Sequence, residues 1–97
     1  MNNKIKNNFK LKELLTVLDV TEEELRGSIR TQRLGDARAL FAAKLIDQPG
    51  VLQTDIADYL HTSQAAVSLM LKRHTCLLIY PHYRSLWCRV EKVKVRG

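Results

Sequence analysis

Proline, glycine, cysteine and long hydrophobic runs are all scarce in this sequence. Two prolines and four glycines in 97 residues leave few positions at which a helix must end. No apolar run approaches the roughly 20 residues that a membrane span needs. The first residues also lack the apolar core of a secretory signal. We therefore expect a cytoplasmic protein with no membrane segment.

Cysteine is too rare for the disulfide framework of a small secreted domain. Cys76 and Cys88 have apolar neighbours in the sequence, so we expect both thiols to be reduced and buried in the core. With His74 and His82 they do not form the two close ligand pairs of a zinc site. We expect no bound metal, and burial of the thiols argues against a catalytic cysteine.

Enzymatic motifs are also missing. The sequence contains no glycine-rich phosphate-binding loop and no recognisable set of acid, base and nucleophile. A chain of 97 residues has room for one apolar core, not for separate cofactor and substrate domains. We expect a single domain over residues 1–97, frayed over residues 1–8, with no catalytic residues and no cofactor.

Basic residues are in excess and concentrated at the two ends. The net charge is +6, of which residues 1–12 and 84–97 each contribute +4 while the middle carries −2. Such a surplus suits a polyanionic partner, but basic tails also serve solubility. Charge alone therefore does not decide between nucleic-acid binding and solvated ends.

Helical periodicity predicts an all-α fold, a small helical domain of about five helices. Apolar residues recur at helical spacing over residues 9–18, 34–47 and 83–93. Thr21 with Glu24 is typical of a capping box that begins another helix. The alanine-rich segment 34–47 has the best helix propensity, and we expect it to be the central helix of the core.

The end of the chain is rich in aromatic residues. Pro81 suits the first position of the last helix, and residues 76–80 are expected to be a buried connection before it. Tyr80, Tyr83 and Trp87 are expected in the core, because aromatic residues at helical spacing are usually buried. A stacking platform for single-stranded nucleic acid is the alternative.

Residues 53–73 fit the helix-turn-helix pattern. With Gln53 as its first position, the residue types expected at five of six key positions are present: Ile56, Ala57, Leu60, Val67 and Met70. The exception is His61, where glycine is usual, so we expect a left-handed conformation at this histidine. Ser63 is expected to cap the second helix, over about residues 64–73, which would lie in the major groove.

The outward residues of that second helix are the candidates for reading bases. The amide of Gln64 can pair with adenine, Ser68 with a base or phosphate, and Ala65 with a thymine methyl group. The other candidate residues are expected to contact phosphates. For Arg30 and Arg33, in the loop, the minor groove is also possible. The remaining candidates for DNA contact are Arg30, Arg33, Thr54, Thr62, Ser63, Lys72 and Arg73.

Over residues 14–73 the order of elements resembles the C-terminal DNA-binding domain of the bacterial replication initiator DnaA, in the Trp-repressor-like superfamily. A short helix, a basic loop over residues 28–33, a long helix opening with Arg38, and the helix-turn-helix follow in turn. The resemblance implies that Arg30 is a minor-groove arginine. The family's Asp-His-Thr-Thr is replaced here by residues 63–66, Ser-Gln-Ala-Ala, so the same DNA target is not implied.

The residues and the resemblance together predict sequence-specific binding of double-stranded DNA by a nucleoid-associated protein, in the control of replication or transcription. A homodimer or a protein partner is compatible with the sequence. The alternative is a protein-interaction adaptor that keeps the helical fold without binding DNA. It is favoured by the near neutrality of residues 53–73, where Asp55 and Asp58 offset Lys72 and Arg73.

Overall fold

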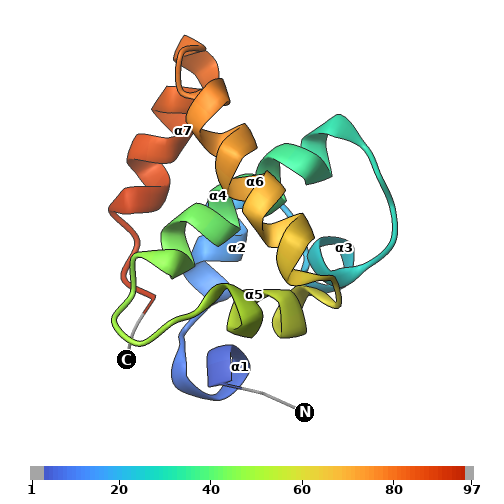
Figure 1. Cartoon of the computed structure of the whole chain (residues 1–97). Coiled ribbons are helices and arrows are strands. Elements are labelled where there is room, and N and C mark those ends of the chain that lie inside the picture. The colour runs from blue at the N-terminus through green and yellow to red at the C-terminus, as the bar shows by residue number, and fades with distance from the viewer. Residues whose placement is uncertain (1–3, 96–97) are drawn as a thin grey trace.

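A computed structural model describes residues 4–95, and within them the fold is all-α, as predicted (Figure 1). The described residues form seven helices and no strand, where the sequence predicted about five helices. The helices are α1 (Lys4–Asn8), α2 (Lys12–Leu18), α3 (Glu22–Arg26), α4 (Gln32–Ile46), α5 (Gln53–Leu60), α6 (Gln64–Leu77) and α7 (Pro81–Glu91).

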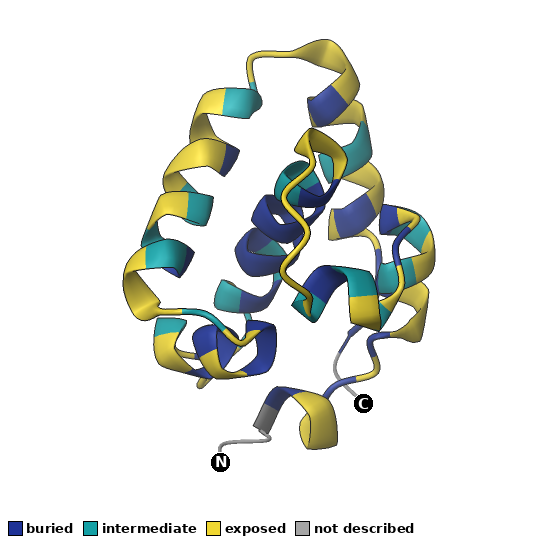
Figure 2. Ribbon diagram, turned by 90° about the vertical axis from the view of Figure 1, so that its right-hand side faces the viewer, coloured by how far each residue is buried: buried dark blue, intermediate teal, exposed yellow. Residues whose placement is uncertain are grey.

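Helix α4 is the central helix of the core, which confirms the prediction for residues 34–47. It contacts α2, α3, α5, α6 and α7. A helix surrounded in this way must be apolar or small on nearly all sides, and the buried residues gather in the middle of the molecule (Figure 2). Its buried residues are Leu34, Ala37, Arg38, Ala39, Leu40, Phe41, Ala42, Ala43 and Leu45.

The N-terminal segment was predicted to be frayed over residues 1–8, but residues 4–8 form α1. The reason is a single apolar residue in a polar stretch, because Ile5 is only 1% exposed and α1 packs on α5. Just after α1, the backbone N–H of Lys10 donates to the carbonyl of Val95 at 2.5 Å. Residues 1–3 of this prediction lie outside the described residues.

Two predicted helix starts are confirmed. The Thr21 hydroxyl accepts from the backbone N–H of Glu24, and the Glu24 carboxylate accepts from that of Thr21, both at 3.0 Å. Pro81 occupies the first turn of α7, where its missing N–H costs nothing. Both starts depend on residues within one helical turn, which explains why the sequence alone predicted them.

Helix α6 continues to Leu77, four residues beyond its predicted end, because its last turns pack on α7. The buried imidazole of His74 lies with Nδ1 2.9 Å from the Tyr83 hydroxyl oxygen. Its ring also meets the Trp87 ring edge-on, with centroids 4.4 Å apart. Of the aromatic residues predicted in the core, Tyr83 is buried, Trp87 is half-buried and Tyr80 is exposed.

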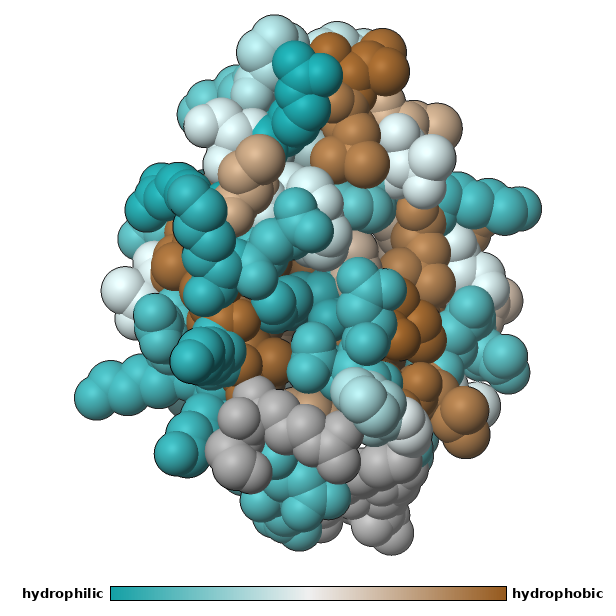
Figure 3. Space-filling model, turned by 90° about the vertical axis from the view of Figure 1, so that its left-hand side faces the viewer, coloured by the Kyte–Doolittle hydropathy of each residue, from teal (hydrophilic) through white to brown (hydrophobic). Residues whose placement is uncertain are grey.

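The prediction that both cysteines are buried was wrong, since Cys76 and Cys88 are exposed. Each lies on the outward side of its helix, because the inward positions are held by His74 in α6 and by Tyr83 and Val90 in α7. Figure 3 shows the α7 side of the molecule, with hydrophilic residues over much of the surface and hydrophobic residues at the end where α6 meets α7. Apolar neighbours in the sequence therefore did not indicate burial.

The packing of His74 predicts a loss of stability in mild acid. Burial lowers the pKa of His74, against the opposing effect of the Asp47 and Glu91 carboxylates. At a pH above the ordinary imidazole pKa of about 6.5, His74 is neutral in both the folded and the unfolded chain and does not make stability depend on pH. Below that pH the unfolded chain binds the proton more readily than the folded protein does, so acid favours unfolding. We expect the free energy of unfolding, measured by urea titration, to fall between about pH 7 and pH 5.

A His74→Gln variant should show a smaller decrease over this pH range, even though it is less stable than the wild type at neutral pH. The exposed His82 provides the matched control, since His82→Gln should retain the wild-type pH dependence. Equal pH dependence in the wild type and His74→Gln would show that other groups cause the decrease.

Candidate nucleic-acid interface

The turn between α5 and α6 has the geometry that the motif requires. His61 is left-handed, with φ 56° and ψ 47°, as predicted. Its N–H donates to the Asp58 carbonyl at 3.3 Å, and the N–H of Thr62 donates to the Ala57 carbonyl at 2.9 Å. This pair of hydrogen bonds is the Schellman motif, which ends a helix and reverses the chain at once.

Helix α6 begins at the predicted residue and with the predicted cap. The Ser63 hydroxyl accepts from the backbone N–H of Ala66 at 3.1 Å. Val67 is fully buried between α6 and the rest of the fold, with Met70 and Leu71 half-buried beside it. The opposite side of the first turns, centred on Ala65, is therefore open to solvent.

Most of the predicted DNA-contacting residues lie on the surface. Thr62 and Ser68 are half-buried, and the other eight are exposed: Arg30, Arg33, Thr54, Ser63, Gln64, Ala65, Lys72 and Arg73. They come from three places along the chain, namely the loop before α4 with the first turn of α4, the start of α5, and the turn leading into α6 together with α6 itself.

Four of these side chains already have partners within the fold, and one of them is Ser63, which caps α6. Arg33 forms an ion pair with Glu24 at 2.7 Å, which turns it toward α3. Arg73 forms an ion pair with Asp36 at 2.8 Å. The Ser68 hydroxyl donates to the side-chain carbonyl of Gln53 at 2.7 Å. Ser68 can then only accept a further hydrogen bond.

Arg38 fixes the loop that carries Arg30. Its guanidinium is buried and donates to four carbonyls at 2.9–3.0 Å, at the end of α3 and in the following loop: Glu24, Leu25, Gly27 and Ile29. Burial, with a contribution from the neighbouring Arg30, lowers the pKa of Arg38. The exposed loop that crosses the front of Figure 2 is thus tied to α4 from beneath.

A groove of about 340 Å³ separates this loop and the start of α4 from α6. Arg30 and Arg73 both line this groove, together with Thr62 before α6 and with Leu69 and Met70 on α6. Within residues 4–95, Arg30 and Lys72 form no ion pair. The structure therefore brings Arg30 and Arg73 together beside α6, but directs Arg33 away from them.

Arg26 joins the turn of the motif to α3. It donates to the Tyr59 carbonyl at 2.6 Å, and its Nη2 lies 2.5 Å from Nε2 of His61. The same guanidinium lies over the Tyr59 ring, 4.7 Å from its centroid, and forms an ion pair with Glu22 at 3.0 Å. Sequence reasoning missed this contact, because Arg26 and His61 are 35 residues apart.

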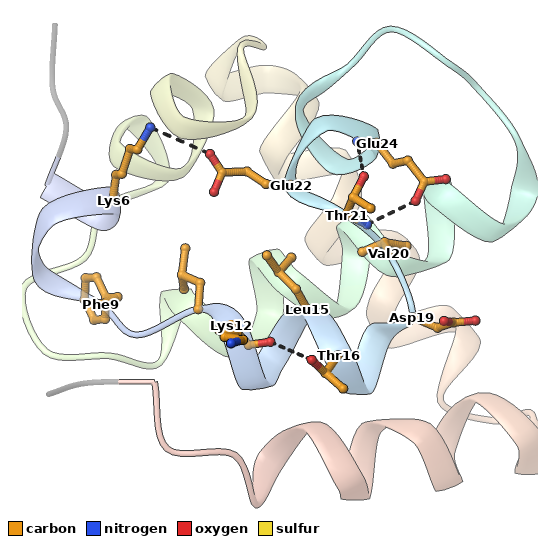
Figure 4. A pocket seen from close by; sticks show the side chains of 11 residues that line it. Lys6, Phe9, Lys12, Leu15, Thr16, Asp19, Val20, Thr21, Glu22 and Glu24 are labelled. Atoms are coloured by element: carbon orange, nitrogen blue, oxygen red, sulfur yellow. Dashed lines mark hydrogen bonds and ion pairs between the residues drawn. The ribbon is translucent and has the colours of Figure 1, made fainter.

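A second hollow, of about 700 Å³, lies between α1, α2 and α3 and contains none of the predicted DNA-contacting residues (Figure 4). Phe9 and Leu15 contribute apolar surface, and Lys6 faces Glu22 across it at 3.9 Å. Glu24 is occupied by its cap and by Arg33, and these hydrogen bonds lower its pKa. Of the charged groups that line this hollow, Lys6 pairs with Glu22, whereas Glu24 pairs with Arg33, which lies outside the lining.

Sequence reasoning also missed Leu69 on the outward side of α6. It is 64% exposed and lies one turn after Ala65. The signal was available in the helical periodicity, because Val67 and His74 mark the inward side and residues 65, 69 and 72 fall opposite them. The hydrogen bond from Ser68 to Gln53 had no comparable signal, since it joins residues 15 positions apart.

No protein-family model, curated protein or solved structure matched this chain when each was compared with it. The resemblance to the DnaA domain thus continues to rest on residues and motifs alone. No helix between residues 4 and 95 is long and apolar enough to cross a membrane. Over the same residues, histidine, cysteine and acidic side chains form no group of three or more suited to a metal ion.

The contacts of Arg38 predict a large effect on stability. Arg38→Met removes four hydrogen bonds from a charged donor and leaves carbonyls without partners, so the free energy of unfolding should fall by about 3 kcal/mol. Arg89→Met, at an exposed position of α7, is the matched control and should change the free energy of unfolding by less than about 0.5 kcal/mol. Chemical denaturation measures both, and similar values for the two variants would contradict the role given to Arg38.

The left-handed turn predicts a difference between two substitutions at His61. Both His61→Gly and His61→Val lose the contact with Arg26, so their difference reports on the backbone. Valine in this conformation is strained, whereas glycine is not. We expect the valine variant to be less stable than the glycine variant by about 1–2 kcal/mol in chemical denaturation. A valine variant as stable as the glycine variant would contradict the turn geometry.

Proposed function

We propose that this protein binds double-stranded DNA sequence-specifically, with the first turns of α6 in the major groove. One observation carries the proposal: the outward side of α6 is open at Gln64 and Ala65, while Val67 anchors the opposite side in the core. A recognition helix needs both properties, since it must be held firmly and still present side chains to base edges. Gln64 is positioned as the reader of adenine.

The charges around α6 support contacts with phosphates. Arg30 and Lys72 have no ion-pair partner in the described part of the chain, and Arg73 shares the groove with Arg30. The ion pair between Arg73 and Asp36 leaves the Arg73 side chain 45% exposed. Exposed ion pairs are weak, so a phosphate can compete with Asp36 for Arg73.

The resemblance to the DnaA domain agrees with this arrangement. The family's basic loop corresponds to the loop that carries Arg30, and the arginine near the start of its long helix corresponds to Arg38. The family's helix-turn-helix corresponds to α5 and α6. On this basis we place the protein in the control of replication or transcription. The substitution at residues 63–66 argues for a DNA target of its own.

A protein-interaction adaptor is the second candidate. It is favoured by the pairing of Arg33 with Glu24 and of Arg73 with Asp36, which reduces the positive charge available to DNA. The two functions differ in their dependence on salt, because only binding to DNA releases counterions in proportion to the phosphates contacted.

The test is selection of binding sites from random duplexes, followed by salt titration of the selected duplex. Contacts from Arg30, Lys72 and Arg73 predict a slope of about −3 for log K against log salt concentration. Arg30→Gln should reduce the slope by about 1. Gln64→Ala should keep the slope and lose about 1–3 kcal/mol of discrimination at one base pair.

Arg89→Gln on α7 is the control and should match the wild type. Failure to select any duplex, or binding without dependence on salt, would leave the adaptor as the better account. Equal losses for Gln64→Ala on selected and unrelated duplexes would remove Gln64 from base reading, without affecting the proposal that the protein binds DNA.

A further inference from the structure

Leu69 is an exposed apolar side chain in the middle of the proposed interface. It is 64% exposed, and within residues 4–95 it is the exposed large hydrophobic residue of α6. Burying a leucine side chain is worth roughly 2 kcal/mol, so leaving it in water forgoes that gain. A ligand that covers this side of α6 with an apolar group would recover that gain.

The surroundings of Leu69 indicate what that partner is. Lys72 and Arg73 follow it on α6, and Arg30 and Arg73 line the same groove. An apolar side chain flanked by cations suits a polyanion that also offers an apolar group. In the major groove of DNA, that apolar group is the C5 methyl of thymine.

Two pairs of residues that could contact bases lie on different parts of the outward side of α6. Gln64 and Ser68 lie toward α5, whereas Leu69 and Arg73 lie toward the loop with Arg30, and Ala65 stands between the two pairs. Because Ala65 is small, it does not shield Leu69 from a ligand that approaches the helix. Leu69 lies about 7.5 Å along the helix from Gln64, comparable to two base-pair steps.

We infer that Leu69 contacts the methyl group of a thymine in the major groove, about two base pairs from the adenine that Gln64 reads. The inference rests on the proposed function. It adds a thymine preference that the polar residues of α6 do not supply, and it assigns that preference to a residue on the loop side of the helix.

The experiment replaces each thymine of the selected duplex, one at a time, by deoxyuridine, which lacks only the methyl group. Wild-type protein should bind roughly four-fold more weakly at one position, the factor expected for one buried methyl group. Leu69→Ala should bind the thymine duplex more weakly and show no further loss with deoxyuridine at that position. Ile79→Ala changes a comparably exposed apolar residue that follows the C-terminal end of α6, and this variant should behave as the wild type.

Wild-type binding that tolerates deoxyuridine at every position overturns the inference but leaves DNA binding intact. The same four-fold loss in Leu69→Ala assigns the thymine to another residue and also overturns it. A wild-type dimer in sedimentation that becomes a monomer with Leu69→Ala would show that a second copy covers this surface instead. If no duplex is selected at all, the proposed function fails first, and the inference fails with it.

Discussion

The proposed interface depends on the hydrogen bonds of the buried Arg38 guanidinium. A charge inside a protein is costly unless hydrogen bonds surround it, and Arg38 has four carbonyl partners. Three of them, those of Glu24, Leu25 and Gly27, belong to the end of α3, where the helix dipole favours a cation. These hydrogen bonds fix the five-residue helix α3 and the loop that follows it to α4. As a result, Arg30 in that loop lies beside α6.

Helix α6 serves two purposes along its length. Its first turns expose Gln64, Ala65 and Leu69, whereas its last turns pack on α7 through the buried His74. The helix is therefore held at both ends, by the α5–α6 turn and by α7. A helix supported in this way presents its open side without having to order itself on binding, which limits the entropic cost of recognition.

The net charge of +6 gives little information about where an anion would bind. Several arginines are used inside the fold: Arg26 and Arg33 connect α3 to its neighbours, and Arg38 is buried. The cations left for a partner near α6 are few, chiefly Arg30 and Lys72, with Arg73 shared with Asp36. Shape and the pattern of side chains on α6 thus carry more of the functional argument than total charge does.

The sequence by itself determined the features that depend on residues within a turn or two of helix. The central helix α4, the caps at Thr21 and Ser63 and the left-handed His61 follow from local periodicity, side-chain hydrogen bonds and backbone preference. Only the tertiary structure decided that both cysteines face solvent and which arginine has a partner. The pairing of Arg33 with Glu24 and the hydrogen bonds of Arg38 join residues on different elements, nine or more positions apart. They depend on how those elements pack, which no pattern within one helix encodes.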